Sequence, residues 1–215
     1  MLFKSVFKRK IKGYIGEYQV LNELKMLSKS KYHIFNDVRI NNSNGSSSQI
    51  DHVVVSHYGI FVIETKNYKG IIKGTETSKD WNQILNQTNR KFYNPISQNQ
   101  GHIYALKYLL RDLEEVTFHS IIVFTTKASL KVNTTTTVVY SDELIKTIKK
   151  HKIKTINPKT KALIIDRLKN PNTVLNNKIV KESCPNCGNS LIHRIGKFGK
   201  FIGCTNYPIC HFTKN

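Results

Sequence analysis

The chain has 215 residues, of which 39% are hydrophobic, so it can hold one medium-sized domain with its own core and one small domain. Lys and Arg number 34 against 14 Asp and Glu, and the formal net charge of +20 favours a polyanionic partner, nucleic acid before an anionic membrane. No apolar run approaches the roughly 20 residues of a membrane span, and the first charges follow a short apolar stretch, the wrong order for a signal peptide. We therefore expect a cytoplasmic protein with no membrane partner.

Residues 13 to about 30 predict an amphipathic helix. Apolar residues such as Leu24 recur at helical spacing, and Glu17 falls on the same face as they do. A glutamate in that position has two interpretations: an ion pair with a lysine at the rim of the core, or a contribution to a functional site. A strand over residues 32–40 and a polar loop over residues 41–48 follow.

Residues 49–56 and 59–66 are β-branched, aromatic-rich runs joined by a tight turn, a pattern that predicts a β-hairpin. If the loop has two residues, Asp51 lies opposite Glu64. If the register shifts by two residues, Asp51 lies opposite Lys66 instead. Either register brings these three side chains together at the far end of the hairpin, because side chains alternate between the faces of a strand.

Two carboxylates at that end repel each other unless a cation lies between them. Hard oxygen ligands with open coordination positions suit Mg²⁺, and a lysine alongside stabilises charge on a phosphate or helps to activate a water. The alternative interpretation is that Glu64 and Lys66 are solvated residues on an edge strand. Their flanking residues are too apolar for a free surface, so we favour the functional interpretation.

The next elements are a short strand around residues 71–72 and a helix that begins at Asn94 and Pro95, a good N-cap followed by a good first helical residue. Gln100 and Tyr104 lie four residues apart and are adjacent on the surface of this helix. The pair has two interpretations: an ordinary surface pair, or part of a functional site. The single tryptophan, between these two elements, is expected to pack in the core, with stacking on a base as the alternative.

A nearly continuous apolar run over residues 120–126 predicts a central strand covered on both faces. Residues 138–140 predict another strand, and Ser141 and Asn157 are expected to cap two further helices, the second ending near residue 168. This order of elements predicts an α/β sandwich over residues 1–170. A linker over residues 171–182 and a small domain over residues 183–215 complete the chain.

The four cysteines all lie in the last segment, in two pairs whose spacing predicts a closed tetrahedral Zn²⁺ site. A segment this short lacks a core, so the metal supplies much of its folding energy. Two disulfides or free thiols are the alternative, which a reducing compartment disfavours. The expected zinc ligands are Cys184, Cys187, Cys204 and Cys210.

Basic and aromatic residues interleave between the two cysteine pairs in a sequence that resembles a hairpin. Positive side chains bind phosphates and exposed rings stack on bases, so this stretch predicts binding to nucleic acid, with unpaired strands preferred. The alternative is that its two phenylalanines cover the zinc site. The residues expected to bind nucleic acid are Arg194, Lys197, Phe198, Lys200 and Phe201.

The hairpin resembles the active-site hairpin of the PD-(D/E)xK, or restriction-endonuclease-like, nucleases, in which an Asp is followed by a hydrophobic turn and Glu-x-Lys. The first half of the chain resembles the bacterial nuclease-related (NERD) domain still more closely. That resemblance is carried by Gly13-x-x-Gly16-Glu17, Gln49-Ile50-Asp51-His52, Gly59 through Lys66, and Asn94-Pro95 followed by Gln98, Gln100 and His102. It implies a restriction-endonuclease-like α/β/α core, a mixed sheet flanked by helices, followed by a small zinc-ribbon domain.

The resemblance also implies roles for the site residues in phosphodiester hydrolysis. Asp51 and Glu64, with the Thr65 carbonyl, hold Mg²⁺ or Mn²⁺, and Lys66 positions or deprotonates the attacking water. The helices support the site: the wider nuclease family often carries a Glu where Glu17 stands. The Gln-x-x-x-Tyr spacing that begins at Gln100 resembles a motif beside the active site in RecB-like branches of the superfamily.

The cysteine-rich tail resembles the C-terminal zinc fingers of bacterial type I topoisomerases, through its Gly-x-Phe-Gly-x-Phe-x-Gly-Cys run and its Tyr-Pro-x-Cys end. This resemblance implies DNA binding. The whole chain is therefore expected to be a Mg²⁺-dependent nuclease acting on DNA, with no small-molecule cofactor. The alternatives are a non-catalytic DNA-binding or DNA-processing module that keeps a nuclease-like fold, and a protein-interaction adaptor on a basic scaffold.

Overall fold

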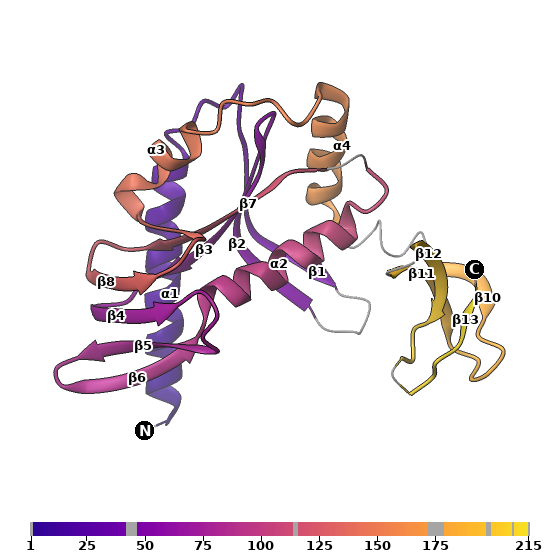
Figure 1. The fold of residues 1–215 in the computed structure, drawn as a ribbon, viewed down its shortest axis with the longest axis horizontal. Helices are drawn as coiled ribbons and strands as arrows, with labels where there is room; N and C mark the ends of the chain where they lie inside the picture. The colour runs from indigo at the N-terminus through magenta and orange to yellow at the C-terminus, as the bar shows by residue number, and fades with distance from the viewer. Residues whose placement is uncertain are drawn as a thin grey trace.

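The computed structural model describes residues 2–41, 47–113, 116–171, 179–196, 199–207 and 209–214. Both helices and strands are present up to residue 169, and the elements described after it are strands. Figure 1 shows both parts. The described helices are α1 (Leu2–Leu24), α2 (Pro95–Leu109), α3 (Leu144–Lys149) and α4 (Pro158–Lys169), with a 3₁₀ turn over Ser141–Glu143.

A mixed sheet of five strands forms the centre of the larger part. Its order is β1-β2-β3-β7-β9, and β1, β2 and β3 are antiparallel neighbours while β3, β7 and β9 run parallel. Central strands β3 and β7 carry the continuous apolar runs expected of strands covered on both faces. The strands are β1 (His33–Asn41), β2 (Ser47–Ser56), β3 (Gly59–Lys66), β7 (Phe118–Phe124) and β9 (Thr137–Tyr140).

Helices cover both faces of this sheet, so the larger part is a three-layer α/β/α arrangement. One face packs against apolar residues of α2 and α4, such as Leu106 and Ile164. The other face packs against α1 and α3, through residues such as Leu24 and Leu144. The expected fold class, a mixed sheet flanked by helices with a small zinc-ribbon region after it, is confirmed. None of the described helices is long and apolar enough to cross a membrane.

A second sheet continues directly from the first, in the order β6-β5-β4-β8. Along the chain, β4 follows β3 and β8 follows β7. In the first sheet β3 pairs with β7 in parallel, and in the second sheet β4 pairs with β8 in parallel. Only β4 was expected from the sequence, which gives little sign of the other three because their residues are mostly polar and at least partly exposed. The strands are β4 (Gly70–Thr75), β5 (Asp80–Leu85), β6 (Thr88–Tyr93) and β8 (Ala128–Asn133).

Trp81 holds the second sheet onto the body of the protein. Its side chain is fully buried and its indole N–H donates to the Thr75 carbonyl at 3.0 Å. The ring lies so close to Gly74 that a Cβ there would stand 2.3 Å from it. The expected packing role of the tryptophan is confirmed, and its ring is not available to stack on a base.

Helix α1 differs from its predicted bounds at both ends. It begins at Leu2, well before Gly13, and ends at Leu24 rather than near Ser30. The N–H groups of Met26 and Leu27 each bond a carbonyl three residues back, which tightens the last turn and stops the helix. At the other predicted cap, Ser141 begins the 3₁₀ turn that leads into α3.

The C-terminal region is a four-stranded antiparallel sheet in the order β10-β11-β12-β13. Its first strand begins inside the stretch 171–182 that was predicted to be linker, because residues 179–180 pair with β11. Strands β11 and β12 form the expected hairpin between the cysteine pairs. The strands are β10 (Ile179–Ser183), β11 (Ser190–Gly196), β12 (Gly199–Cys204) and β13 (Thr213–Lys214).

Candidate nuclease site and zinc centre

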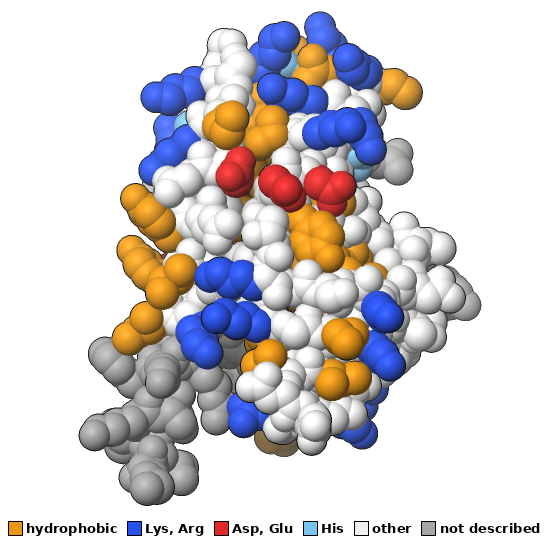
Figure 2. Space-filling model, turned by 90° about the vertical axis from the view of Figure 1, so that its left-hand side faces the viewer, with side chains coloured by type: hydrophobic (Ala, Val, Ile, Leu, Met, Phe, Trp, Pro, Cys, Tyr) orange, Lys and Arg blue, Asp and Glu red, His pale blue; other side chains and the backbone are white. Residues whose placement is uncertain are grey.

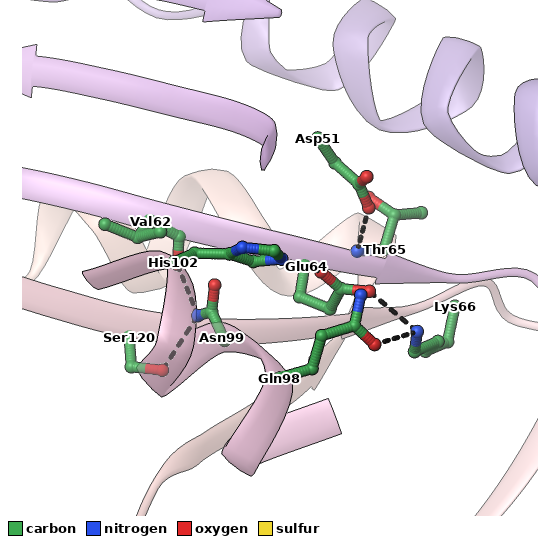
Figure 3. Close-up of polar contacts among 9 residues, drawn as sticks. All are labelled: Asp51, Val62, Glu64, Thr65, Lys66, Gln98, Asn99, His102 and Ser120. Carbon is green, nitrogen blue, oxygen red and sulfur yellow. Dashed lines mark hydrogen bonds and ion pairs between the residues drawn. The ribbon is translucent and has the colours of Figure 1, made fainter. Parts of the chain in front are cut away.

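The hairpin of β2 and β3 adopts the first of the two expected registers. Ser56 pairs with Gly59, and the pairing runs to His52 and Ile63. The next residues along are Asp51 and Glu64, so the two carboxylates meet at the end of the hairpin. The Thr65 N–H donates to Asp51 Oδ2 at 2.8 Å, which fixes the Asp51 carboxylate beside β3 (Figure 3).

Lys66 bonds both Glu64 and a residue of α2. Its ammonium donates to Glu64 Oε1 at 2.6 Å and to Gln98 Oε1 at 3.0 Å (Figure 3). Glu64 is only 2% exposed and the Lys66 side chain 16% exposed, so this is a buried ion pair. The structure therefore brings Asp51, Glu64 and Lys66 together as expected.

Helix α2 presents Gln98 and His102 to the site rather than Gln100. His102 Nε2 lies 3.3 Å from Glu64 Oε2, within ion-pair range although outside hydrogen-bonding geometry. Gln100 is exposed, and Tyr104 is 63% exposed. An α-helix turns about 100° per residue, so Gln100 points about 200° away from Gln98. The structure does not bring Gln100 to the site.

Asn99 explains why α2 presents that side. Its side chain is fully buried, and its amide donates to the Val62 carbonyl at 2.9 Å and to Ser120 Oγ at 2.8 Å (Figure 3). These bonds fix α2 to β3 and β7 at once. Asn94 starts the helix as expected, because its side-chain oxygen accepts the Ile96 N–H at 2.9 Å. The rotation of α2 is thus fixed by contacts to the sheet.

Burial and neighbouring charges together set the pKa values of the site. They act in the same direction on Asp51 and in opposite directions on Glu64 and Lys66. Burial raises the pKa of Asp51 to about 8, and the Glu64 charge adds to the shift while the Thr65 N–H opposes it. Burial alone would raise the pKa of Glu64, but His102 and Lys66 together hold that pKa below its ordinary value. Burial disfavours the Lys66 ammonium, yet Glu64 holds the pKa of Lys66 above its ordinary value. In the metal-free protein, Glu64 and Lys66 are charged.

Glu17 of α1 interacts electrostatically with the same site. Its pKa is raised by partial burial and then by the negative charges of Asp37 and Glu64, while Lys66 opposes the shift. A role for Glu17 in the site stays a prediction.

Asn67 joins α1 to the hairpin. Its amide donates to the Lys12 carbonyl of α1 at 2.7 Å, and its oxygen accepts the Thr125 hydroxyl at 3.0 Å. A Cβ on Gly16 would lie 2.6 Å from the Asn67 Cβ. Gly16 is therefore required for α1 to approach the end of β3 this closely. Asn67 directly follows Lys66 and was not among the expected site residues.

The donor set of this site fits a hard divalent cation. Two carboxylates lie together, Glu64 buried and Asp51 partly buried, and Glu64 Oε2 has no hydrogen-bond partner among the described residues. A buried charged oxygen without a hydrogen bond is costly unless it pairs or binds a metal. Carboxylate oxygens are the ligands that Mg²⁺ and Mn²⁺ prefer.

The four cysteines form a metal-binding cluster in the C-terminal region. Their sulfur atoms all lie within 4.8 Å of one another, and none forms a disulfide. Gly188, at φ +72°, closes the turn that carries the first pair, and its N–H donates to the Cys184 carbonyl at 2.8 Å. The second pair comes from the end of β12 and the segment after it. Four thiolates this close support a structural Zn²⁺ site.

The hairpin between the cysteine pairs is described only in part. Arg194 and Phe201 are paired across β11 and β12 and both are partly exposed. Arg194 donates to the Cys204 carbonyl at 2.8 Å, and its guanidinium lies 5.7 Å from the Tyr207 ring centre. Arg194 thus has contacts within the ribbon itself. Lys197, Phe198 and the side chain of Lys200 lie outside the described residues.

Comparison with known proteins matches the two parts to two families. A profile of the nuclease-related domain matches residues 12–125, and a profile of the topoisomerase DNA-binding C4 zinc finger matches residues 181–215. No solved structure matches the chain.

Similar curated proteins divide in the same way. An uncharacterized protein of Bacillus anthracis is 36% identical over 130 residues, 59% of this chain and 60% of that protein. DNA topoisomerase 1 of Methanocaldococcus jannaschii is 55% identical over 48 residues, 21% of this chain and 6% of that enzyme. The uncharacterized protein YrdD of Escherichia coli is 50% identical over 42 residues, 20% of this chain and 21% of that protein. The matches thus span 60% of these relatives at most. Because the first profile covers just over half of the 215 residues, the chain belongs to the nuclease-related domain (NERD) family and carries a topoisomerase-type C4 zinc ribbon at its C-terminus.

Proposed function

We propose that this protein is a metal-dependent nuclease of the PD-(D/E)xK type that hydrolyses phosphodiester bonds in DNA. The observation that carries the proposal is the charged group at the hairpin end: Asp51 beside the buried Glu64, with Lys66 bonded to Glu64 at 2.6 Å. Removing carboxylates and an ammonium from water costs free energy, so a group of this kind indicates a function. Strongly shifted pKa values around such a group are typical of functional sites.

Each residue of the site has a separate role in the proposal. Asp51, Glu64 and the Thr65 carbonyl would hold Mg²⁺ or Mn²⁺, with Glu17 supporting them from α1. The bound ion would polarise the phosphate and lower the pKa of a coordinated water. Lys66 stabilises the negative charge that develops on the phosphate.

The α2 helix positions the lysine. Gln98 accepts a hydrogen bond from Lys66 at 3.0 Å, and His102 lies beside the other oxygen of Glu64. These two residues take the supporting role that was expected of Gln100. In this proposal Gln98 and His102 are positioning residues, since they act on the reaction through Lys66 and Glu64.

The zinc ribbon is proposed as the DNA-binding part, with a preference for single strands. Its similarity to the topoisomerase zinc finger supports DNA binding, and Arg194 and Phe201 offer a guanidinium and a ring for phosphate and base contacts. A cytoplasmic location, in which the four thiols stay reduced, belongs to the same proposal.

The test is direct incubation of purified protein with single-stranded and double-stranded DNA. We expect strand cleavage with Mg²⁺ or Mn²⁺, and none after a chelator is added or in a Glu64→Ala variant. The variant should still bind DNA, because affinity comes from the basic surface. Binding without cleavage under every divalent metal would replace this proposal with the non-catalytic DNA-binding module.

A further inference from the structure

The outward face of the second sheet carries a row of lysines that neither the core nor the candidate nuclease site uses. The strand registers align Lys131 of β8 with Lys73 of β4, Lys73 with Asn82 of β5, and Asn82 with Lys91 of β6. Residues aligned across neighbouring strands share one face of a sheet. The row therefore crosses all four strands, and all three lysines are exposed.

This lysine row lies on the face opposite the core. Ile72, Trp81 and Phe92, each adjacent in sequence to a member of the row, point inward and pack together. The outward face is hollowed between the strands, and Lys73 and Lys131 both line the hollow. Hydroxyl and amide side chains and one carboxylate line the same hollow: Thr75, Asn82, Asn133 and Asp80.

The row is electrostatically unfavourable for the protein alone. Neighbouring strands lie about 4.8 Å apart, and like charges aligned across them are destabilising. Among the residues that the structure describes, no carboxylate forms an ion pair with Lys73, Lys91 or Lys131. A polyanion laid across the sheet would neutralise the row.

A nucleic acid backbone has the chemistry that this face fits. Its phosphates carry regularly spaced negative charges, which lysines bind without reading sequence, and hydroxyl and amide side chains donate to phosphate oxygens. On the side of the molecule on which β8 lies in Figure 1, acidic side chains are confined to one short row (Figure 2).

The row is also close to the candidate site along the chain. Strand β4 begins four residues after Lys66, and Lys73 lies seven residues after Lys66. Seven extended residues span at most about 23 Å, and successive phosphates of one strand advance by about 3.4 Å along a duplex. A duplex held on the row thus has phosphates within about seven nucleotides of the site.

We propose that the outward face of the second sheet binds the phosphate backbone of duplex nucleic acid through Lys73, Lys91 and Lys131. The face is separate from the zinc ribbon in sequence and differs from it in chemistry, because it has lysines and amides where the ribbon has aromatic rings. The inference concerns binding alone and does not depend on cleavage, so it is tested without added Mg²⁺ or Mn²⁺.

The test compares two variants of the full chain that lose the same charge. One carries Lys73→Gln, Lys91→Gln and Lys131→Gln, and the control carries Lys149→Gln, Lys150→Gln and Lys152→Gln, all exposed lysines at and after the end of α3. The probe is a fluorescent 30-base-pair DNA duplex of mixed sequence, and its fluorescence anisotropy is measured between about 50 and 200 mM NaCl.

The row variant should lose salt dependence as well as affinity. Each lost phosphate contact lowers the slope of log K against log salt by about 0.9, so three contacts remove about 2.7. The ratio of wild-type to variant affinity should then be about 40-fold larger at 50 mM than at 200 mM NaCl. The control variant should keep most of the wild-type slope. Equal losses in the two variants, or no loss in the row variant, would overturn the proposal.

Three further measurements exclude damage to the fold and binding of a different polyanion. Removing like charges should leave the melting temperature of the DNA-free protein at low salt unchanged or raise it. The variant with Arg at the three positions should retain the affinity that the Gln variant loses. If the Gln variant binds duplex DNA normally but no longer binds anionic phospholipid vesicles, the face is a lipid surface and the proposal is wrong.

Discussion

At the scale of single residues, the site depends on one buried ion pair. Glu64 is 2% exposed and is flanked by Lys66 on one oxygen and His102 on the other. Removing one partner of a buried pair leaves the other charge uncompensated, which typically costs about 3–5 kcal/mol. The same lysine is proposed to stabilise charge in the reaction, so its loss should affect stability and activity together.

Replacing Lys66 by Met should lower the free energy of unfolding of the metal-free protein by about 3 kcal/mol, since His102 still faces Glu64. Metal-dependent cleavage should fall at least about 100-fold in kcat. Added Mg²⁺ should restore part of the lost stability, because an ion bound only by the folded state stabilises it. Chemical denaturation and a cleavage assay check the two effects.

The matched control is Lys69→Met, an exposed lysine three residues further along the chain. It removes the same charge and should change the free energy of unfolding by about 0.5 kcal/mol or less. Wild-type cleavage by the Lys66 variant would exclude this residue from the catalytic machinery.

At the scale of secondary-structure elements, the contact of α1 with the end of β3 decides where Glu17 lies. That contact depends on Gly16, because a Cβ there would stand 2.6 Å from the Asn67 Cβ. Gly13, one turn earlier in the same helix, would place a Cβ 3.6 Å from Glu17 Oε1, an ordinary contact distance. The two glycines therefore make a matched pair for mutation.

Gly16→Ala should destabilise the protein by about 1–3 kcal/mol, because overpacking forces α1 away from the hairpin. Gly13→Ala should stabilise it by about 0.5–1 kcal/mol, since alanine favours the helix over glycine. Thermal unfolding of both variants measures the difference. A stabilising Gly16→Ala variant would contradict the close approach of α1 to Asn67.

The end of α3 supplies a pH-dependent contact with the sheet. His151 lies against His119, with ring centres 3.9 Å apart, and both rings contact Phe61. Burial, and then the charge of His119, lower the pKa of His151 below its ordinary value of 6.5. A base with a lowered folded-state pKa contributes stability that is complete above 6.5 and is lost as the pH falls through the folded-state value.

Asp51 and Glu17 have raised pKa values and act in the opposite direction, because they stabilise the folded state as the pH falls. The expectation is therefore comparative: between pH 7.5 and pH 5, the melting temperature of the wild-type protein should fall relative to that of a His151→Gln variant. Differential scanning calorimetry at the two pH values measures both proteins. An equal fall in the variant would mean that other groups cause the acid sensitivity. A suitable control is His193→Gln, an exposed histidine of the zinc ribbon that should leave the pH dependence as it is.

At the scale of the whole molecule, the proposed chemistry and the proposed DNA-binding part occupy different regions of the chain. The nuclease-related match ends at residue 125 and the zinc-finger match begins at residue 181. No residue of the candidate nuclease site comes from the ribbon. Loss of the ribbon should therefore weaken binding without removing catalysis.

Cys184→Ser should lose the zinc ion that elemental analysis is expected to find once in each wild-type chain. Without the metal the ribbon should unfold, because a segment this small depends on it. Affinity for single-stranded DNA should drop, while any cleavage should persist at high substrate concentration with a raised KM. A zinc-free ribbon that stays folded through two disulfides would contradict the zinc assignment, and unchanged single-strand affinity would point to a protein partner for the ribbon.

The sequence alone determined the local features of both sites. Both expected registers brought Asp51, Glu64 and Lys66 together, because the side-chain period of two is a property of any hairpin and needs no other contact; the structure decided between the two registers. The zinc centre followed from the spacing of four cysteines in the same way. The apolar runs likewise predicted central strands β3 and β7, because strands buried on both faces need them.

The tertiary structure alone decided what surrounds the hairpin. The apolar stripe of α2 has two flanks, with Gln98 on one and Gln100 on the other, and the bonds of Asn99 to β3 and β7 choose which flank faces the site. Strands β5 and β6 were missed because their residues carry no clear alternation, whereas β8 alternates over six residues and was missed in spite of that pattern. Gly16 and Asn67 meet across 51 positions of sequence. Local periodicity fixes which face of an element is apolar, but the rotation and pairing of elements depend on contacts between residues far apart in the chain.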